Sequence, residues 1–335
     1  MACRDTRVCY LNRILLIVIL LVIALILVRY ENMKNNPPVK NFYKSLIDST
    51  TIDKLDSIVI RQHSKKRTII LVKRDSYWEV KNRNWKMGKT AYEDLMEALK
   101  SLRREELVSL KPDSSLYKKL DLTDDKNTIL ELFSKGKLEY KFIFGKNATG
   151  YNLLYYKDAK SGNIYIVSGV SKYFLDRAPE LLISKELYKV NPDSIESFYL
   201  ENREKNKKID IEVKRVGQDS VIYKVTYNDT LIKNIKEVNV KAYLTTMSRI
   251  LMFDVLKDPQ DPKEYEDYKI SLIIRTPNRV LEYRMKESKD KNDNIYYLAM
   301  DMKTHRVFKM SKWVVNGWFK KRDYFEEEKN TSSKK

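Results

Sequence analysis

The chain has 335 residues, of which 43% are hydrophobic, and it contains only eight Gly and eight Pro. This length and composition are typical of folded material in about two ordinary domains and exclude a largely disordered chain. The 65 Lys and Arg outnumber the 46 Asp and Glu, for a formal net charge of +19. Because the basic residues are spread over different predicted elements, the sequence argues against nucleic acid as a partner.

The first predicted element is a membrane-spanning helix near the N-terminus. Residues 14–28 are apolar without a break, and Arg29 and Tyr30 suit the polar interface that follows a span. Neither a small-residue cleavage pattern nor a lipoprotein-type Cys comes after the run. Residues 14–30 are therefore predicted to form an uncleaved transmembrane anchor.

The charges around this run predict its orientation. Arg4, Arg7 and Arg13 precede it, and the positive-inside rule places such a segment in the cytoplasm. Several lysines that follow the run favour the opposite orientation. We expect residues 1–13 to be the cytoplasmic tail of a single-pass protein of the inner or cytoplasmic membrane, with the folded part outside the cytoplasm.

The next elements predict a mixed α+β unit. Residues 31–52 contain a Pro pair, which cannot sustain a helix, and are predicted to be a linker. Then follow a three-stranded meander, an amphipathic helix over residues 89–104, a strand, a second meander of four strands and an apolar helix over residues 170–182. Residues 53–190 are predicted to form this first unit.

The same order of elements then repeats at an offset near 140 residues. DSIESFYL, with Asp193 first, matches DSIVIRQ, with Asp56 first, and the central helix contains an Ala-Tyr pair in both halves. Six matched segments in one order predict a duplication, with residues 191–325 as the second unit. The predicted fold class is α+β, with two related domains that each have a mainly antiparallel sheet and packed helices. Residues 326–335 are predicted to be a charged, disordered tail.

Glycine and cysteine positions exclude several classes of site. No Gly-rich phosphate loop follows a predicted strand, which disfavours a nucleotide-binding doubly wound fold. Gly145 and Gly150 bracket a predicted hairpin connection, where a positive φ favours Gly. Cys3 and Cys9 are the only cysteines, so the folded part can hold neither a disulfide framework nor a Cys-based metal site.

The titratable residues predict no catalytic, cofactor-binding or metal-binding site. His63 and His305 are the only histidines, and both fall in predicted polar turns. A hydrolytic pair would need two carboxylates facing one cleft, and the strand periodicity explains the carboxylates as turn caps or solvated positions. These carboxylates include Asp56, Asp193, Glu131, Glu139 and Glu282.

Two tryptophans near the C-terminus are the candidate partner contacts. Trp313 and Trp318 stand five residues apart in SKWVVNGWFKKRDYF, a helix-like segment. Such a segment packs on the second sheet or presents its aromatic side chains to a partner, and both alternatives stay open.

The chain resembles a bacterial family known as the domain of unknown function 4340 family. The resemblance covers nearly the whole chain after the predicted anchor. Its most specific parts are the strand end with Trp78 and Val80, and the strand end with Phe144 and Gly145 followed by the hairpin of Tyr151. The family is associated with gliding-motility-type ABC transporter auxiliary genes. It has no catalytic residues, so the resemblance implies none in this sequence.

The second half matches the family pattern less well, because Tyr223 replaces the Trp and Met285 has no Gly beside it. The resemblance implies a membrane-anchored accessory protein that works with an ABC-type permease or another envelope complex. We expect a non-enzymatic interaction module without a cofactor. The alternatives are an extracytoplasmic hydrolase acting on glycan or peptide, and a receptor for an acidic envelope polymer, to which the positive charge would be attracted.

Overall fold

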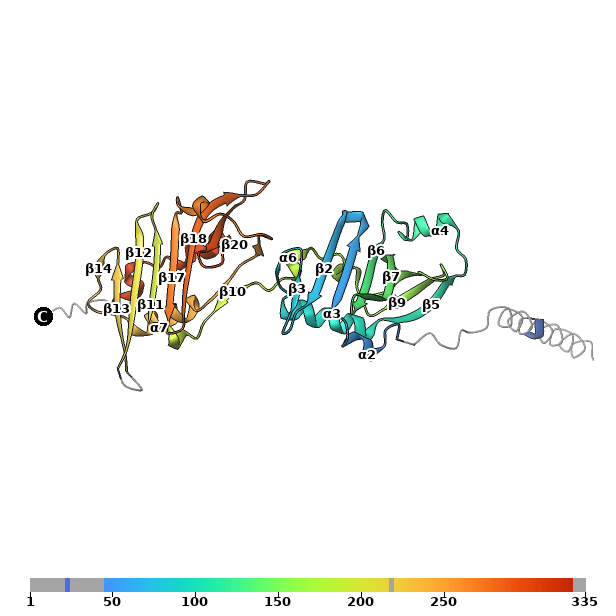
Figure 1. Cartoon of the computed structure of the whole chain (residues 1–335), viewed down its shortest axis with the longest axis horizontal. Coiled ribbons are helices and arrows are strands. Elements are labelled where there is room, and N and C mark those ends of the chain that lie inside the picture. Colours follow the sequence, from blue (N-terminus) through green and yellow to red (C-terminus); the bar gives the residue numbers. More distant parts are fainter. Residues whose placement is uncertain (1–21, 25–44, 217–219, 328–335) are drawn as a thin grey trace, which may run out of the picture.

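The fold was analysed in a computed structural model, which describes residues 22–24, 45–216 and 220–327. It is a mixed α+β structure with two large antiparallel sheets of nine strands each. Figure 1 shows the two sheets one after the other along the longest axis of the molecule. The predicted α+β class is therefore confirmed.

The first sheet has the strand order β4-β3-β2-β1-β6-β7-β8-β9-β5. Its strands are β1 (Ser57–Gln62), β2 (Arg67–Lys73), β3 (Trp78–Val80), β4 (Trp85–Lys86), β5 (Arg103–Ser109), β6 (Thr128–Ser134), β7 (Lys137–Asn147), β8 (Leu154–Asp158) and β9 (Ile164–Ser168). The helices of this half are α2 (Ser49–Ile52), η1 (His63–Lys65), α3 (Lys89–Ser101), α4 (Ser114–Lys119), α5 (Lys172–Leu175) and α6 (Pro179–Leu182).

The second sheet has the order β14-β13-β12-β11-β17-β18-β19-β20-β16. The strands of this half are β10 (Glu186–Lys189), β11 (Ser197–Asn202), β12 (Lys207–Val216), β13 (Ser220–Tyr227), β14 (Thr230–Leu231), β15 (Arg249–Leu251), β16 (Asp254–Val255), β17 (Ile270–Thr276), β18 (Arg279–Lys289), β19 (Ile295–Asp301) and β20 (Val307–Ser311). Its helices are η2 (Pro192–Ser194), α7 (Glu237–Met247), η3 (Pro262–Tyr265), α8 (Lys312–Trp318) and α9 (Arg322–Phe325). Strands β10 and β15 pair separately as a two-stranded sheet.

The predicted N-terminal elements fall mostly on residues that are not described. The predicted cytoplasmic tail, 1–13, and the predicted anchor, 14–30, lie outside the described residues except for 22–24. The same holds for 31–44 of the predicted linker and for 328–335 of the predicted tail. Within the described part of the chain, no helix combines the length and the apolar character needed to cross a membrane.

The described end of the predicted linker belongs to the folded structure. Ser45 forms a β-bridge with Arg103, and the short helix α2 follows. Ile47 and Ile52 are 2% and 4% exposed, so both side chains lie in the core. The Pro pair earlier in the linker predicts where a helix cannot form, but not how soon afterwards the chain begins to pack.

Strands β1, β2 and β3 of the first sheet have the same register as β11, β12 and β13 of the second. Ser57 of β1 pairs with Val72 of β2, and Ser197 of β11 pairs with Glu212 of β12. Trp78 pairs with Lys73, and Tyr223 pairs with Val213 at the corresponding place. The predicted correspondence of Trp78 with Tyr223 is therefore confirmed.

The predicted match of Asp56 with Asp193 is wrong by three residues. Because Ser57 corresponds to Ser197, Asp56 corresponds to Glu196, whereas Asp193 lies in η2 before the strand begins. The backbone N–H of Asp56 donates to the carbonyl of Phe133 at the end of β6, and that of Glu196 donates to the carbonyl of Arg275 near the end of β17. Strand register follows which face is buried, and a shared Asp-Ser-Ile tripeptide does not determine it.

The helix predicted over residues 89–104 is α3, which ends at Ser101. Its buried side chains, Ala91, Leu95, Ala98 and Leu99, form the apolar face that the sequence predicts. Leu102 has an extended backbone, with ψ of 116°, and the chain continues directly into β5. The predicted end was three residues late because the helix and the strand follow each other without a loop.

The helix predicted over residues 170–182 is two short helices, α5 and α6. Pro179 is the first residue of α6, and Ala178 before it has an extended backbone with ψ of 154°. A residue before Pro is disfavoured in the helical region because the Pro ring crowds its backbone. The Pro therefore starts a new helix and ends the continuity of the predicted one.

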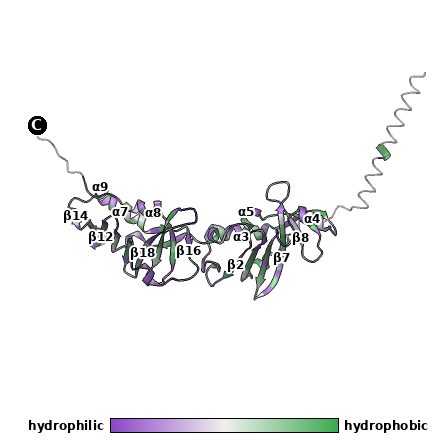
Figure 2. Ribbon diagram, turned by 90° about the horizontal axis from the view of Figure 1, so that it is seen from above, coloured by the Kyte–Doolittle hydropathy of each residue, from purple (hydrophilic) through white to green (hydrophobic). Residues whose placement is uncertain are grey.

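The longer helices lie on one side of the two sheets (Figure 2), and the main core lies between these helices and the sheets. Figure 2 shows α3, α5, α7 and α8 along the same side of the molecule, with strands of both sheets on the other. The core runs through both halves and includes Leu95, Phe144, Phe198, Tyr243 and Met285. Tyr243 is 1% exposed, whereas Tyr92 of the matched Ala-Tyr pair is 39% exposed. The two tyrosines therefore do not occupy corresponding positions on their helices, and this predicted match is wrong.

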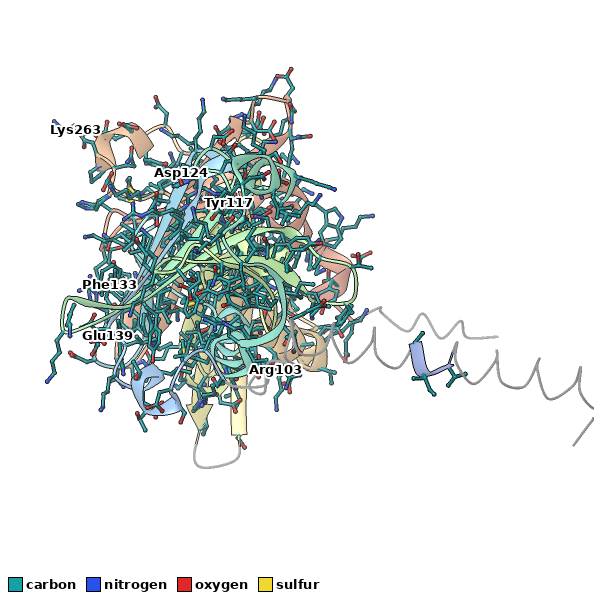
Figure 3. All side chains as sticks on the ribbon, turned by 90° about the vertical axis from the view of Figure 1, so that its right-hand side faces the viewer. Arg103, Tyr117, Asp124, Phe133, Glu139 and Lys263 are labelled. Carbon is teal, nitrogen blue, oxygen red and sulfur yellow. The ribbon has the colours of Figure 1, made fainter. Side chains whose placement is uncertain are left out.

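Each sheet also has a small second cluster on its opposite face. In the first half Leu120, Leu122 and Ile164 pack next to α4, and in the second half Tyr265 of η3 packs with Met300 and Val307. Side chains alternate between the two faces of a strand, which separates these clusters from the main core. Viewed along the long axis, Tyr117 of α4 and Lys263 of η3 lie in the upper part, opposite Arg103 (Figure 3).

Gly145 is inside β7 and is not at the predicted turn. Its φ is not positive, whereas Gly150 in the following turn has a φ of +120°. A Cβ at position 145 would overlap the carbonyl oxygen of Leu120, which accepts a hydrogen bond from Lys146 N–H at 3.0 Å. Close approach of another backbone segment, rather than turn geometry, accounts for this Gly.

Candidate functional site

The two halves meet where the turn between β3 and β4 contacts β16. Arg83 of this turn lies 3.0 Å from Asp254 through Nε and 3.2 Å from Glu180 through Nη2. Lys309 Nζ lies 3.4 Å from the second carboxylate oxygen of Asp254. The Asp254 side chain is only 9% exposed, so the ion pairs that it forms are less screened than those of exposed side chains, and its pair with Arg83 links the two halves.

An aromatic contact lies beside this ion cluster. Trp85 of β4 packs edge to face on Phe308 of β20, with ring centroids 5.2 Å apart. The guanidinium of Arg306 lies 5.3 Å from the Trp85 ring, and its Nη2 donates to the carbonyl of Arg83 at 3.0 Å. Trp85 Nε1 donates to the carbonyl of Ser184 at 3.1 Å. Trp85, which belongs to the first half, therefore contacts both the connection between the halves and the second half.

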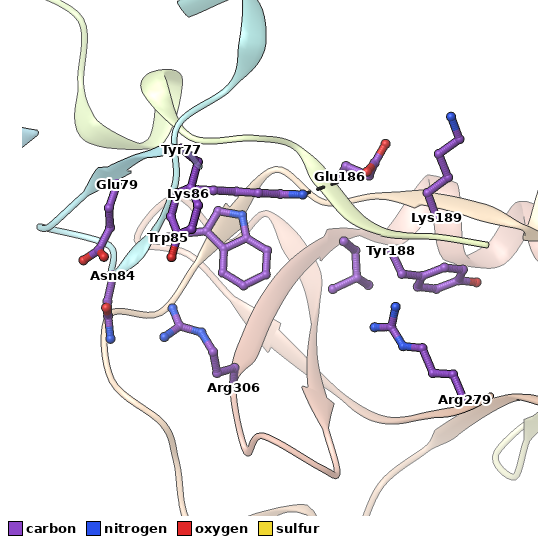
Figure 4. Close-up of a pocket in the computed structure, with 11 residues that line it drawn as sticks. Tyr77, Glu79, Asn84, Trp85, Lys86, Glu186, Tyr188, Lys189, Arg279 and Arg306 are labelled. Carbon is purple, nitrogen blue, oxygen red and sulfur yellow. Dashed lines mark ion pairs between the residues drawn. The ribbon is translucent and has the colours of Figure 1, made fainter. Parts of the chain in front are cut away.

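Two hollows adjoin at this junction. One has a volume of about 500 Å³ and lies around Trp85, and the other has about 900 Å³ and lies along the start of α3. Tyr77, Lys86 and Glu186 line both, and we call the two hollows together the junction groove. Figure 4 shows the smaller hollow, where the indole of Trp85 lies between Lys86 and Arg306.

The junction groove is strongly basic. Its lining includes nine Lys and Arg but only three carboxylates, a ratio of three to one, whereas the whole chain has 65 to 46. The carboxylates are Asp75, Glu79 and Glu186. The cations are Lys73, Arg74, Lys86, Lys89, Lys185, Lys189, Arg249, Arg279 and Arg306. This excess creates a local positive potential that attracts anions.

Two cations of the groove are half-buried. Lys185 Nζ donates to the backbone carbonyls of Glu180 and Phe253, and Arg306 donates to the carbonyls of Arg83 and Leu256. Burial lowers the pKa of both Lys185 and Arg306, because the charged form loses hydration. Among the described residues, no carboxylate oxygen lies within 4.0 Å of either cationic group.

Aromatic and apolar side chains line the rest of the groove. Tyr77 and Tyr92 are 46% and 39% exposed, and Leu251 is 52% exposed. Trp78 and Met87 are buried at the floor of the larger hollow. Tyr, Trp, Met and Arg are enriched in protein–protein interfaces, so this lining is typical of a surface that binds another chain.

Tyr188 has a structural role in the smaller hollow. Its hydroxyl donates to the carbonyl of Met247 at 2.7 Å, and its ring stacks on Tyr283 with centroids 5.8 Å apart. Burial raises its pKa well above the ordinary value. The phenol therefore stays neutral and cannot serve as a base at neutral pH.

The carboxylates considered from sequence lie on separate elements. The predicted solvated position of Glu131 is wrong, because this residue of β6 is 8% exposed and lies between Arg61 and Lys141, at 3.1 and 3.5 Å. Asp56 accepts a hydrogen bond from Lys135 N–H, Glu139 is exposed on β7, and Glu282 pairs with Arg284. Asp193, His63 and His305 lie in turns or in short 3-10 helices. Within the described residues, no group of three His, Cys, Asp or Glu side chains could hold a metal ion.

The two candidate partner tryptophans differ in exposure. Trp318 is 5% exposed and packs in the main core, where its carbonyl accepts a hydrogen bond from Tyr243 at 3.0 Å. Trp313 is 84% exposed on the first turn of α8. The side chain of Trp318 is thus withdrawn from any partner surface, and Trp313 alone stays a candidate contact.

Sequence reasoning missed the junction groove. Its lining residues come from segments more than 200 positions apart, such as Lys86 and Arg306. A usable signal is the placement of Trp85 in KNRNWKMG, a polar turn where a Trp has no core to enter unless another segment covers it.

The described residues form a two-sheet α+β protein with a basic groove where its halves meet. The sequence profile of the family described as a domain of unknown function (DUF4340) matches residues 78–268, more than half of the chain. The chain therefore belongs to this family. The matched residues extend from β3 to the segment before β17 and contain most of the groove. No curated protein and no solved structure matches the chain.

Proposed function

We propose that this protein is a non-enzymatic interaction module that binds a protein of a cell-envelope complex through the junction groove. The observation that carries the proposal is the groove itself, whose lining comes from both halves and combines aromatic, Met and Arg side chains with excess positive charge. Such a combination favours binding over chemistry, because these groups contribute contact area and charge complementarity.

The same proposal includes the location of the module, which is anchored in a membrane. The apolar run of residues 14–28 and the arginines before it support an anchor with the described domains outside the cytoplasm. The resemblance to a family associated with ABC transporter auxiliary genes supports a permease or another envelope complex as the partner. Removal of residues 1–30 is expected to release the protein from the membrane fraction.

We also infer that the two halves arose by duplication. The shared register of β1 and β2 with β11 and β12, and the small clusters at Ile164 and Val307, support this inference. Both small clusters lie on the face opposite the main core. An experimental structure in which the two sheets failed to superpose strand for strand would contradict it.

Photo-crosslinking in the cells that produce the protein tests the proposed function. A photoreactive amino acid at Tyr77 lies in the groove, and one at Tyr151, which is 91% exposed in a turn, is the control. Membranes are extracted after irradiation, and adducts are purified on a C-terminal tag and identified by mass spectrometry. We expect a membrane-complex subunit to be attached at Tyr77 and absent at Tyr151. Equal adducts at both positions, or none at Tyr77, would refute the proposed use of the groove.

A further inference from the structure

The two half-buried cations of the groove are incompletely neutralised. Lys185 and Arg306 are solvated by backbone carbonyls, which stabilise a positive charge without cancelling it. In addition, the buried Nε of Arg306 has no hydrogen-bond partner among the described residues. Asp254 and Glu180 act on Lys185, and Asp258 and Glu79 on Arg306, only from beyond 4.0 Å. An anion that entered the groove would bring a negative charge to within ion-pair distance of these two cations.

Exposed cations lie along both hollows. Lys73, Lys89 and Arg249 line the larger hollow, whereas Lys189 and Arg279 line the smaller one. Arg249 pairs with Glu186 at 3.1 Å and Lys89 with Glu93 at 3.8 Å, and the other three have no carboxylate within 4.0 Å among the described residues. Lys86 lies between the hollows, and its Nζ is 4.0 Å from Glu186, at the limit of an ion pair. The positive charge is thus spread along the groove, which suits an extended ligand with several negative groups better than a single compact anion.

The apolar lining distinguishes between classes of extended anion. Tyr77, Met87, Ile183 and Leu251 lie in the same hollow as the cations. A peptide offers apolar side chains next to its carboxylates and can fill such positions. An anionic polysaccharide has no apolar side chains, so these contacts would be lost in its complex.

We propose that the junction groove binds an extended acidic segment of a partner protein. Its carboxylates pair with Lys185, Arg306 and the exposed cations, and its apolar side chains pack on Tyr77 and Leu251. This inference rests on the proposed function and specifies the chemistry of the partner. Recognition of acidic motifs by basic clusters is an established mode of peptide binding.

Direct binding to the full-length chain in detergent tests the inference. The probes are a fluorescent peptide in which Glu and Leu alternate, and a fluorescent oligogalacturonate of the same net charge. The groove variant combines Lys73→Gln, Lys86→Gln and Arg279→Gln, which are surface positions. The matched control combines Lys137→Gln, Lys160→Gln and Lys291→Gln, which remove the same charge from exposed sites elsewhere.

We expect the peptide to bind the native chain and the control variant alike, and the groove variant more weakly by roughly tenfold or more. Binding should also weaken as salt rises. If both variants bound the peptide equally weakly, the loss of binding would be due to the change in net charge alone, and the inference would be overturned. Absence of peptide binding to the native chain, or tighter binding of the oligogalacturonate, would overturn it as well.

The crosslinking experiment separates this inference from the proposed function. A chain that captures an envelope protein at Tyr77 but fails to bind the acidic peptide would refute only the chemistry of the ligand. A chain that binds the peptide but captures no protein in cells would refute the proposed function while leaving a groove specific for acidic peptides.

Discussion

Arg83 and Asp254 form an ion pair across the junction of the two halves, with Nε 3.0 Å from Oδ1. Asp254 also accepts from Val255 N–H at 2.9 Å and lies 3.4 Å from Lys309 Nζ. Asp254→Asn keeps the volume of the side chain but leaves both cations without this carboxylate. We expect it to lower the free energy of unfolding by roughly 2 kcal/mol, less than for a fully buried pair because Arg83 keeps Glu180.

Urea unfolding followed by circular dichroism measures this effect. Asp229→Asn is the control, because Asp229 pairs with Lys208 at 2.6 Å but its side chain is 76% exposed. Exposed ion pairs contribute between zero and about 1 kcal/mol. If the two variants shifted the unfolding midpoint equally, the junction pair would have no special structural role.

The two C-terminal tryptophans should separate stability from partner binding. Trp318→Ala removes a buried ring and is expected to cost roughly 3 to 5 kcal/mol. Trp313→Ala should change the free energy of unfolding by less than about 0.5 kcal/mol, since its ring is 84% exposed. Thermal unfolding of both variants checks the stability, and the yield of crosslinked partner in cells checks the binding. A fully retained partner yield with Trp313→Ala would remove Trp313 from the contact surface.

Gly145 and Gly317 should respond in opposite ways to Ala. Gly145→Ala forces a Cβ against the carbonyl oxygen of Leu120 and is expected to destabilise the chain by roughly 2 kcal/mol. Gly317 lies in α8, and a methyl group there would meet no atom of the described residues within 4 Å. Gly317→Ala should therefore be neutral or stabilise by up to about 1 kcal/mol. Differential scanning fluorimetry of the two variants gives the sign of each effect, and a neutral Gly145→Ala would show that the segment of Leu120 shifts freely.

Asp210 should destabilise the fold when it ionises. Burial, and next the carboxylate of Glu212, raise the pKa of Asp210 above its ordinary value of 3.8. The carboxyl group of Asp210 therefore binds a proton more tightly in the folded state than in the unfolded state. Its contribution to the stability of the fold is present at low pH and is lost as the pH rises through the pKa of the folded state. The Asp210→Asn variant should be more stable than the native chain near neutral pH. This difference in stability should disappear when the pH falls below the ordinary pKa of an Asp side chain.

Urea midpoints measured from acid to neutral pH test this dependence. Glu212→Gln is the informative second variant, because it keeps Asp210 but removes the neighbouring negative charge, and it should weaken the pH dependence without abolishing it. A constant difference between Asp210→Asn and the native chain at every pH would show that Asp210 has the same pKa in both states.

The sequence predicts the parts of the fold that depend on local pattern. The apolar face of α3 and the correspondence of Trp78 with Tyr223 are both confirmed, because each depends on a pattern of residues close in the chain. The predictions are wrong where tertiary packing determines the position of a residue. The strand register places Glu196 where an Asp was expected, and Leu120 passing over β7 explains Gly145 better than a turn does.

The candidate site could not be predicted in the same way. Arg83 and Asp254 are separated by 171 positions, and neither has a sequence neighbour that indicates the pairing. Trp313 and Trp318 stand out in the sequence because the chain has only four Trp, whereas Lys185 and Arg306 are two basic residues among 65. Their significance comes from half-burial at the junction, which only the arrangement of both sheets creates.

The contact of Trp85 with Phe308 also limits how the protein can polymerise. Strand β4 is one border of the first sheet and β16 one border of the second, and the junction brings the two together. Open sheet borders are templates on which a foreign strand can pair. The other two borders are β14, with two residues, and β5, which begins with two Arg and two Glu. Shortness and charge both discourage strand addition, so the two nine-stranded sheets are protected against edge-to-edge aggregation at these borders.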